Sequence, residues 1–469
     1  MQNIAYKKII LILIVAAAIF LDRLDITIVN IALPKLAHVF HVSVTQLDWV
    51  SNSYLIALAC FIPISGWVGE RYGLKKTFIL STAFFAVGTL LCALSFNLIS
   101  IVIARFIQGI GGGMIIPVGM TLIYKKFEHD DYARITSFIF LPTLLAPGVA
   151  PFLGAVIMTF WSWHWIFLVA IPVCLLIILS AYYYIEMDIP DKSLRKPCDQ
   201  LGVILTSGFL IAIQLFLSEV GRTGLTMNVL MIFGLACSLF YFWYKHEVKT
   251  PYPLIKLSYF KNKMFISANL LQLVFQASHF GSFFLIGLYL QVGVGFSAIH
   301  TGLIIGMQAV GALCTGRLSA YLYQKYGAYM PVVMGLLGIG LFSYGILFFV
   351  RSNSDAMLFT GMGILFLRGI SSGLCGVPIQ TLGVISFKKH EMADINAIFN
   401  TCRQISISLG IALSSLLIGY GAKIENSNLT NYHQPYTIVQ GTFQYAFILI
   451  PIFCISGILV SAYMFLNER

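Results

Sequence analysis

The sequence is poor in charge. Only 10 % of its 469 residues are Asp, Glu, Lys or Arg, whereas 59 % are hydrophobic. Soluble globular domains carry about 25 % charged residues, so this chain is not an ordinary soluble domain. The composition predicts an all-α polytopic membrane protein, in which each span satisfies its own backbone hydrogen bonds.

Patterns that hold cofactors are also missing. Eight of the nine cysteines lie in apolar segments and Cys198 lies in a basic loop, so neither a disulfide framework nor a Cys/His metal site is predicted. No G-x-x-x-x-G-K-[ST] phosphate loop is present, which argues against ATP as the energy source. We expect no metal and no cofactor. In a membrane protein an excess of Lys and Arg reflects which loops lie in the cytoplasm, and this accounts for the formal charge of +11. No nucleic-acid partner is therefore expected either.

The apolar segments predict fourteen membrane spans. Lys7 and Lys8 precede the first span as in a signal peptide, but no small-x-small cleavage site ends it, so we expect it to be retained. The expected spans cover residues 8–33, 47–68, 77–95, 98–123, 134–159, 163–185, 200–218, 227–245, 264–291, 299–323, 329–350, 356–385, 393–421 and 441–466.

Basic residues are unevenly divided between the two sets of connections. The set that includes both termini holds 21 Lys and Arg residues, and the other set holds four. The positive-inside rule makes the first set cytoplasmic, so both termini are expected in the cytoplasm. Four arginines remain inside spans: Arg23, Arg105, Arg368 and Arg403.

Two long basic connections divide the chain into three parts. We expect an N-terminal six-helix bundle over residues 1–186 and a C-terminal six-helix bundle over residues 264–469. Residues 187–263 form a linker region with two extra transmembrane helices.

The two sets of six spans echo one another. Residues 70–73, Glu-Arg-Tyr-Gly, recur as residues 324–327, Gln-Lys-Tyr-Gly, after the second span of the last set. Arg105 opens a glycine-rich fourth span, and Arg368 opens its counterpart. Parallel repeats of this kind have a substrate cavity near the membrane midplane.

The first span carries an unusual group of charges: Asp22, Arg23 and Asp25. The apolar run before them, from Ile9 to Leu21, has 13 residues, whereas a span needs about 20. The span therefore continues through the charges, which are costly inside a membrane and usually face a bundle interior or a water-filled cavity. One interpretation is a proton or cation site. The alternative is that Arg23 neutralises both acids at the outer interface.

Residues 66–76 form a short connection after the second span. Its Gly66 and Gly73 permit a tight turn and close helix approach, and Glu70 can pair with Arg71 across helix ends. With Lys75, these residues are the candidate cytoplasmic gate. The alternative is a simple hairpin with a basic anchor.

The fourth and fifth spans contain small residues around special positions. Arg105 and Gln108 precede four glycines in residues 109–113, which permit close helix packing. We expect Arg105 to face protein or a cavity and to bind a carboxylate or a carbonyl; the alternative is that it snorkels to the membrane surface. In the fifth span, Pro147 and Pro151 predict a kink, with Gly154 close by.

Polar residues also occur in the ninth span. Gln272, Gln276 and His279 lie on a helix that opens the second half. A neutral His279 making core hydrogen bonds is one interpretation, and a titrating group facing a cavity is the other. We name Asn30, Gln108, Gln276 and His279 as cavity candidates.

These motifs resemble those of the major facilitator superfamily. Residues 66–76 resemble its signature loop G-x-L-A-D-R-x-G-R-K, with Glu70 in place of Asp and Leu74 in place of a basic residue. In that superfamily this loop gates the cytoplasmic side. The Arg105 motif is similar to a fourth-span motif linked to proton transfer. Residues 146–155 are similar to the exporter Gly-Pro motif, with Ala150 and Ala155 in place of glycines.

The closest likeness is to the fourteen-span drug:proton antiporter family. Residues 24–34 closely resemble its L-D-x-T-I-V-N-V-A-L-P motif, and residues 163–167, 253–262 and 403–406 also look like that family. The resemblance implies two six-helix bundles with two extra linker helices. It also implies that Asp25, Asp22, Arg105, Arg403 and Arg368 couple protons to substrate.

We therefore expect a secondary active exporter of the bacterial cytoplasmic membrane. By alternating access, proton entry would drive efflux of lipophilic, cationic small molecules such as drugs and dyes. The protein is expected to be a monomer in the lipid bilayer. The alternatives are a dedicated exporter of one metabolite, such as a siderophore or an amino acid, a membrane-embedded enzyme, and a channel.

Asp25 is the expected coupling carboxylate. It aligns with the first-span Asp of the family motif. Asp22 is adjacent to Arg23, which would supply its counter-charge, whereas Asp25 is expected to point away from Arg23 and to lack a fixed partner.

Overall fold

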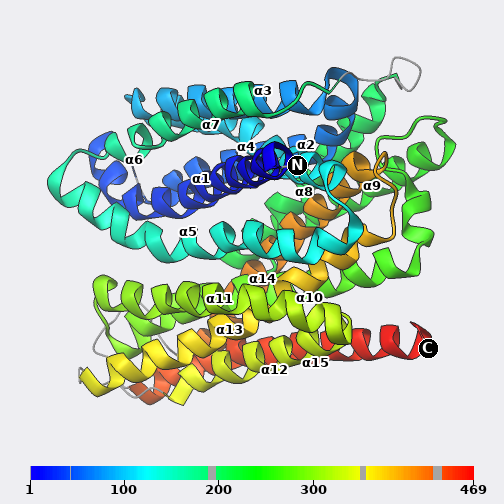
Figure 1. Cartoon of the computed structure of the whole chain (residues 1–469). Coiled ribbons are helices and arrows are strands. Elements are labelled where there is room, and N and C mark those ends of the chain that lie inside the picture. The colour runs from blue at the N-terminus through cyan, green and yellow to red at the C-terminus, as the bar shows by residue number, and fades with distance from the viewer. Residues whose placement is uncertain (1, 43, 189–196, 349–354, 426–435, 469) are drawn as a thin grey trace. The chain divides into compact units, whose positions relative to one another are not determined.

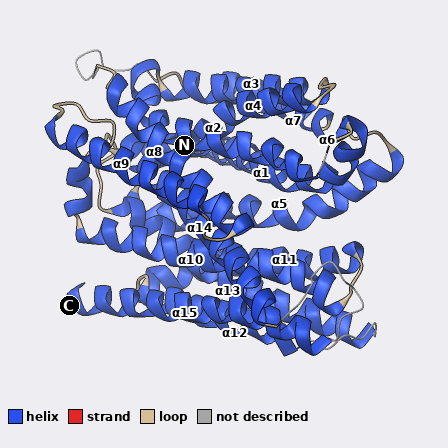
Figure 2. Cartoon of the chain, turned by 180° about the vertical axis from the view of Figure 1, so that it is seen from behind, coloured by secondary structure: helices blue, strands red, loops and turns tan. Residues whose placement is uncertain are grey.

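The computed structural model describes residues 2–42, 44–188, 197–348, 355–425 and 436–468 (Figure 1). Every regular element in these ranges is helical (Figure 2). The main helices are α1 (Gln2–Phe40), α2 (Val44–Tyr72), α3 (Leu74–Ala93), α4 (Leu98–Lys126), α5 (Tyr132–Phe160), α6 (Trp165–Leu168), α7 (Ala170–Tyr184), α8 (Gln200–Thr223), α9 (Met227–Lys249), α10 (Lys263–Leu288), α11 (Ala298–Tyr326), α12 (Tyr329–Gly345), α13 (Asp355–Ile385), α14 (Met392–Ile424) and α15 (Tyr436–Glu468).

Twelve helical segments among the described residues are long and apolar enough to cross a membrane. The other two expected spans, 8–33 and 134–159, fall within α1 and α5, which include residues whose side chains are not described. The fourteen-span count and the cytoplasmic position of both termini therefore stay predictions.

Glycines end two equivalent helices. Gly73, between α2 and α3, has a φ of 94°, and Gly327, after α11, has a φ of 72°. Residues with a Cβ rarely adopt this backbone conformation, which explains why a helix stops at each glycine. These are the last residues of the repeated Glu-Arg-Tyr-Gly and Gln-Lys-Tyr-Gly motifs, so the sequence repeat corresponds to a repeated turn.

The chain forms two compact units. Unit 1 comprises residues 1–211, 236–259 and 387–401, and unit 2 comprises residues 212–235, 260–386 and 402–469. The helices α8, α9 and α14 each contribute residues to both units. The division into two bundles and a linker region stays a prediction.

Helices pair in the same pattern within each unit. In unit 1, α4 packs against α2 and α3, and α7 packs against α3. In unit 2, α13 packs against α11 and α12, and α15 packs against α12. The repeated pairing places Arg105 on α4 and Arg368 on α13, the fourth long helix of each set.

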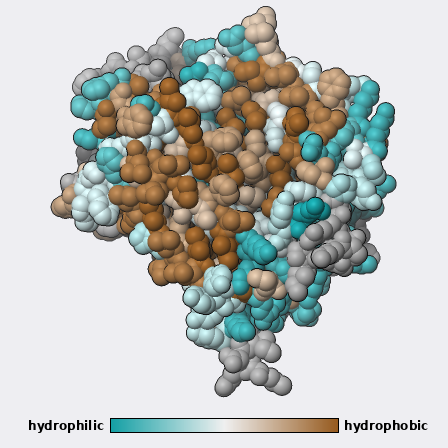
Figure 3. Space-filling model, turned by 90° about the horizontal axis from the view of Figure 1, so that it is seen from above, coloured by the Kyte–Doolittle hydropathy of each residue, from teal (hydrophilic) through white to brown (hydrophobic). Residues whose placement is uncertain are grey.

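The outer face of α3 and α7 is apolar. Figure 3 shows a large hydrophobic area on this side of the molecule. Such an area on a protein with many candidate spans is suited to contact with lipid. Exposed apolar side chains on these two helices include Leu80, Phe84, Val87, Leu91, Leu175, Leu176 and Leu179.

Candidate functional site

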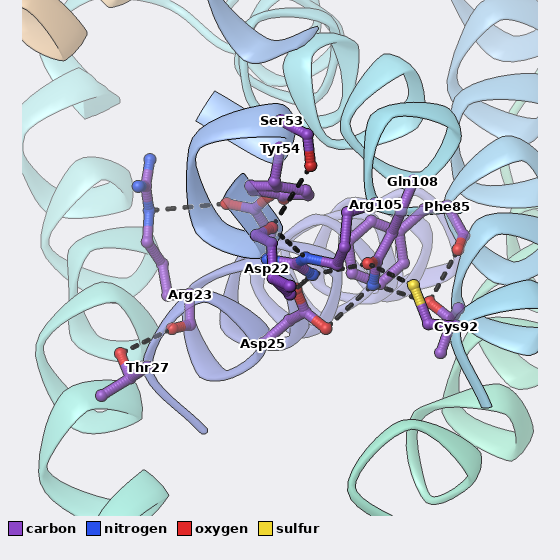
Figure 4. A network of polar contacts seen from close by, with 12 residues as sticks. Asp22, Arg23, Asp25, Thr27, Ser53, Tyr54, Phe85, Cys92, Arg105 and Gln108 are labelled. Atoms are coloured by element: carbon purple, nitrogen blue, oxygen red, sulfur yellow. Dashed lines mark hydrogen bonds and ion pairs between the residues drawn. The ribbon is translucent and has the colours of Figure 1, made fainter. Parts of the chain in front are cut away.

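Asp25 on α1 and Arg105 on α4 form a buried ion pair in unit 1 (Figure 4). Arg105 Nη1 lies 2.5 Å from Asp25 Oδ2, and the two side chains are only 2 % and 4 % exposed. The amide of Gln108 donates a hydrogen bond to the other carboxylate oxygen, Oδ1, at 2.8 Å. Both oxygens of Asp25 therefore have a fixed donor.

Arg105 binds a second helix through the backbone. Its Nε donates to the carbonyl oxygen of Val50, on α2, at 3.2 Å. Its Nη1 also donates to Gln108 Oε1 at 2.6 Å. The expectation that Arg105 faces protein or a cavity and binds a carboxylate or a carbonyl is confirmed: it faces protein, binds one of each, and does not snorkel to the surface.

Asp22 has a different principal partner. The hydroxyl of Tyr54, on α2, donates to Asp22 Oδ1 at 2.5 Å. The ring of Tyr54 also faces Arg105, with 4.3 Å between the ring centroid and the guanidinium carbon. Tyr54 therefore contacts Asp22 directly and also contacts Arg105, the partner of Asp25.

Asp25 has fixed partners, contrary to the prediction from the sequence. We expected Asp25 to lack a fixed partner, but it is paired with Arg105 and Gln108. Asp22 does lie beside Arg23, yet the distance from Arg23 Nε to Asp22 Oδ2 is 3.6 Å, longer than the hydrogen bond from Tyr54. The partners come from other helices, so neighbours along α1 could not reveal them.

Glycines allow α4 to pack closely against α1 and α2, as expected. A Cβ at Gly112 would collide with the Tyr54 hydroxyl and lie 2.9 Å from Asp22 Oδ1. A Cβ at Gly109 would lie 2.7 Å from the carbonyl oxygen of Tyr54. The glycines of α4 therefore leave room for the polar network itself.

Three members of the network were not predicted from the sequence. Besides Tyr54, these are Thr89 and Cys92 on α3, which contact Gln108. Gln108 Nε2 donates to Thr89 Oγ1 at 2.8 Å, and Cys92 Sγ lies 3.7 Å from Gln108 Oε1. The polar run at residues 51–54 inside an apolar span was the available signal for Tyr54. No such signal marks Thr89 and Cys92, because both residue types are common in apolar helices.

Unit 2 has a second buried guanidinium with a different set of partners. Arg368 is fully buried on α13, and its Nε donates to Ser343 Oγ at 2.8 Å. Its Nη2 donates to the carbonyl oxygen of His279 at 3.0 Å, and it also binds Ser282 and Gln308. No carboxylate accepts a hydrogen bond from Arg368 in the described part of unit 2.

His279 is buried within the same cluster. Its ring packs on Phe275, with 5.6 Å between the ring centroids, and its Nε2 lies 3.4 Å from Gln308 Nε2. Gln276, one helical turn after Gln272, donates to the Gln272 side chain at 3.5 Å. The contacts of His279 with Phe275 and Gln308 resemble those of a core histidine. A titrating role for His279 stays the alternative prediction.

The candidate gate has well-defined local geometry. Asp188, from the connection after α7, accepts hydrogen bonds from the backbone N–H groups of Leu74 and Lys75 at 2.5 and 3.0 Å. Lys75 Nζ donates to the carbonyl oxygen of Tyr182 at 2.6 Å. A Cβ at Gly66 would lie 2.8 Å from the carbonyl oxygen of Ala393, so Gly66 permits close approach to the start of α14 within unit 1. Glu70 and Arg71 lie at the end of α2, half-buried.

The remaining candidates are more scattered. Arg403 is buried in unit 2, and Gly154 is buried on α5. The side chains of Asn30, Pro147 and Pro151 lie outside the described residues, so the fifth-span kink stays a prediction. No group of His, Cys, Asp and Glu suited to a metal ion occurs among the residues that the structure describes.

Comparison with known proteins gives a consistent picture. Residues 15–411 match the model of the Major Facilitator Superfamily. A Klebsiella pneumoniae (strain 342) protein named "Putative multidrug resistance protein MdtD" is 30 % identical over 434 residues, which cover 90 % of this chain and 88 % of that protein. A protein of the same name from Yersinia pestis (strain Pestoides F) is 29 % identical over 415 residues, covering 87 % of this chain and 86 % of the relative.

Solved structures agree on the fold. The human organic anion transporter MFSD10 matches with a TM-score of 0.66 at 13 % identity, over 97 % of this chain and 99 % of that one. The proton:xylose symporter XylE also matches with a TM-score of 0.66, at 14 % identity, over 98 % of this chain and 96 % of that one.

Proposed function

We propose that this chain, which belongs to the major facilitator superfamily, exports lipophilic, cationic small molecules in exchange for protons. Its family makes it a multi-pass transporter of the bacterial inner membrane and not an enzyme. The relatives named as multidrug resistance proteins support export of foreign compounds. The buried acids of α1 support a cationic substrate and proton coupling, because a carboxylate attracts either a proton or an organic cation.

The observation that carries the proposal is the Asp25–Arg105 ion pair. A proton can bind Asp25 Oδ2 only if that oxygen separates from the guanidinium, which lies 2.5 Å away. Proton binding at Oδ2 is therefore tied to a movement of Arg105, and proton binding at Oδ1 to a movement of the Gln108 amide, which donates to that oxygen. Breaking a buried pair is costly because it leaves an uncompensated charge, so the freed guanidinium must find another partner.

The pair also connects the first four helices. Arg105 holds α2 through the carbonyl of Val50, and Gln108 holds α3 through Thr89, while both bind Asp25 on α1. Release of Asp25 from Arg105 would loosen α1 from α4 and leave the contacts with α2 and α3. This gives the proton a direct effect on helix packing, as alternating access requires.

Asp22 is the second acid in the proposal. It is 1 % exposed and accepts a hydrogen bond from a neutral hydroxyl, that of Tyr54. We propose that Asp25 alternately binds the proton and attracts the cationic substrate, with Asp22 as an auxiliary acid of the same network. Arg368 and Arg403 stay candidate coupling residues, and residues 66–75 a candidate gate.

Efflux of a panel of dyes and antibiotics tests this function. Everted vesicles with the wild-type protein should transport lipophilic cations, and a proton uncoupler should abolish that transport. Asp25→Asn should lose the uncoupler-sensitive component, whereas Asp130→Asn, which neutralises an exposed acid in the connection before α5, should keep it. Transport of a single metabolite and no dye would favour the dedicated exporter, and transport that ignores the uncoupler would contradict proton exchange.

A further inference from the structure

A cavity of about 220 Å³ opens in unit 1 where the end of α4, the end of α7 and the first turns of α1 meet. Its lining combines three lysines, Lys7, Lys8 and Lys126, with Glu186 and a set of apolar side chains. We propose that this cavity binds the phosphate headgroup and the adjoining apolar segment of an anionic phospholipid. The lipid would come from the leaflet on the lysine-rich side of the membrane.

The charges around the cavity favour an anion. Three ammonium groups and one carboxylate leave an excess of two positive charges. Lys126 donates a hydrogen bond to Glu186, and Lys7 Nζ lies 3.8 Å from the same carboxylate. The hydrogen bond and charge of Lys126 lower the pKa of Glu186, so this group stays charged at neutral pH. Glu186 therefore orients two lysines and balances only one of the three charges.

A neighbouring acid does not cancel this excess. Glu128 acts electrostatically on Lys8, but its carboxylate accepts a hydrogen bond from Lys389 at 2.8 Å, which lowers the pKa of Glu128. Lys389 thus supplies the counter-charge of Glu128. Lys8 itself lies over the ring of Phe127, with 4.9 Å between Nζ and the ring centroid, which holds its ammonium at the cavity.

The other part of the lining is apolar. Leu11, Leu122 and Ile185 are 7 %, 5 % and 5 % exposed, whereas the side chains of Lys7 and Lys126 are 53 % and 47 % exposed. An accessible charged edge above a buried apolar base matches the two chemical parts of a phospholipid. A free phosphate ion would use the lysines and leave the apolar base unoccupied. Basic pockets between transmembrane helices are known to suit anionic headgroups.

The cavity is distinct from the transport site. Leu11 and Asp25 are both on α1, and a rise of about 1.5 Å per residue separates them by about 21 Å along the helix. The volume of 220 Å³ is also below the range of about 300–1,000 Å³ that encloses a drug-sized ligand. A headgroup with part of a chain fits this space, and the rest of the lipid would extend into the bilayer.

Native mass spectrometry of the full-length protein in detergent tests the proposal. The probes are phosphatidylglycerol and phosphatidylcholine with the same acyl chains, and inorganic phosphate. Wild-type protein should retain one phosphatidylglycerol more strongly than phosphatidylcholine. The triple variant Lys7→Gln, Lys8→Gln and Lys126→Gln should bind it at least about tenfold more weakly, since each lysine near an anionic headgroup contributes severalfold.

A matched triple variant separates the cavity from general surface charge. Lys76→Gln, Lys245→Gln and Lys249→Gln remove three exposed lysines elsewhere in unit 1 and should leave binding unchanged. Glu186→Gln should strengthen retention, because it removes the carboxylate that lies in the described lining and competes for the lysines. This gain cannot result from misfolding.

Three outcomes would overturn the proposal. Equal losses in the two triple variants would show unspecific charge attraction. Competition by inorganic phosphate as strong as that by the lipid would show a site for free anions. Equal retention of phosphatidylcholine and phosphatidylglycerol would show that the headgroup charge is not recognised.

Discussion

The hydroxyl of Tyr54 donates a 2.5 Å hydrogen bond to Asp22. Because the same ring lies over Arg105, the partner of Asp25, the two acids of α1 are not independent. A change in the charge of Asp22 would reorient Tyr54 and thereby alter the surroundings of Arg105. Exchange of a proton for a cationic substrate at Asp25 would then respond to the charge of Asp22.

Tyr54→Phe should uncouple the two acids. It removes the hydroxyl but keeps the ring over Arg105, and a hydrogen bond to a charged group such as Asp22 contributes about 1.5–3 kcal/mol. We expect transport of cations to fall about tenfold or more at unchanged expression. Kinetics of dye efflux from everted vesicles across pH measure the effect.

Tyr124→Phe is the matched control for Tyr54→Phe. Tyr124 is equally buried in unit 1, and its hydroxyl lies 3.0 Å from Thr136 Oγ1, away from the acidic network. It should lose some stability and keep the pH profile of efflux. Identical pH profiles in both variants would remove Tyr54 from the coupling mechanism.

Asp25→Asn should abolish proton-driven efflux of dicationic substrates and affect neutral substrates less. It also leaves the guanidinium of Arg105 buried without a counter-charge, so we expect destabilisation of about 3–5 kcal/mol. Adding Arg105→Gln should restore thermal stability without restoring transport. Unfolding temperature and uncoupler-sensitive efflux, measured on both proteins, separate folding from function.

Asp22→Asn should be milder than Asp25→Asn in the same assays. It removes a charge that lies 3.6 Å from the guanidinium of Arg23, whereas Asp25 and the guanidinium of Arg105 are only 2.5 Å apart. Full activity in Asp25→Asn with loss only in Asp22→Asn would reverse the two assignments.

Gly73→Val should impair transport and leave membrane insertion intact. The backbone at Gly73 has a φ of 94°, and a Cβ there would lie 3.1 Å from the carbonyl oxygen of Asp188, whose side chain caps α3. Gly224→Val is the control, because Gly224 also has a positive φ, of 73°, but has open space around it. Equal transport by the two variants would mean that the turn matters only through backbone strain.

Cys198 should react only from the cytoplasm. It is an exposed cysteine in the connection between α7 and α8 that carries the basic residues of the cytoplasmic set. A membrane-impermeant maleimide should label it in everted vesicles and not in intact cells, with Cys198→Ser as the control for other thiols. Labelling in intact cells would reverse the orientation of the whole chain.

Much of the fold could be predicted because membrane spans depend on local composition. Apolar length alone located the twelve segments that the structure describes as long enough to span. The turn at Gly73 and its repeat at Gly327 were visible as matching four-residue motifs. The composition of the two compact units could not be predicted, because α8, α9 and α14 contribute to both. Contacts between segments that are distant in the sequence decide which residues belong to one unit.

The site was predictable only in part, for a geometric reason. The sequence indicates which residues share a face of one helix, but it does not give the register between helices. It therefore named Asp25 and Arg105 separately and missed that these residues form a pair. Tyr54 and Thr89 were missed because a buried hydroxyl is recognised as functional only once its partner is known: Tyr54 donates to Asp22, and Thr89 accepts from Gln108.

The uncharged hydrogen-bond acceptors that the structure describes for Arg368 have an electrical consequence. Asp25 and Arg105 together carry no net charge, so their joint displacement across the bilayer does no work against the membrane potential. Arg368, whose described hydrogen-bond acceptors are hydroxyl, amide and carbonyl oxygens, carries a whole positive charge. A full unit of charge moved through the field costs about 2.3 kcal/mol per 100 mV. A displacement of Arg368 along the membrane normal would therefore add a dependence on the membrane potential to the transport cycle.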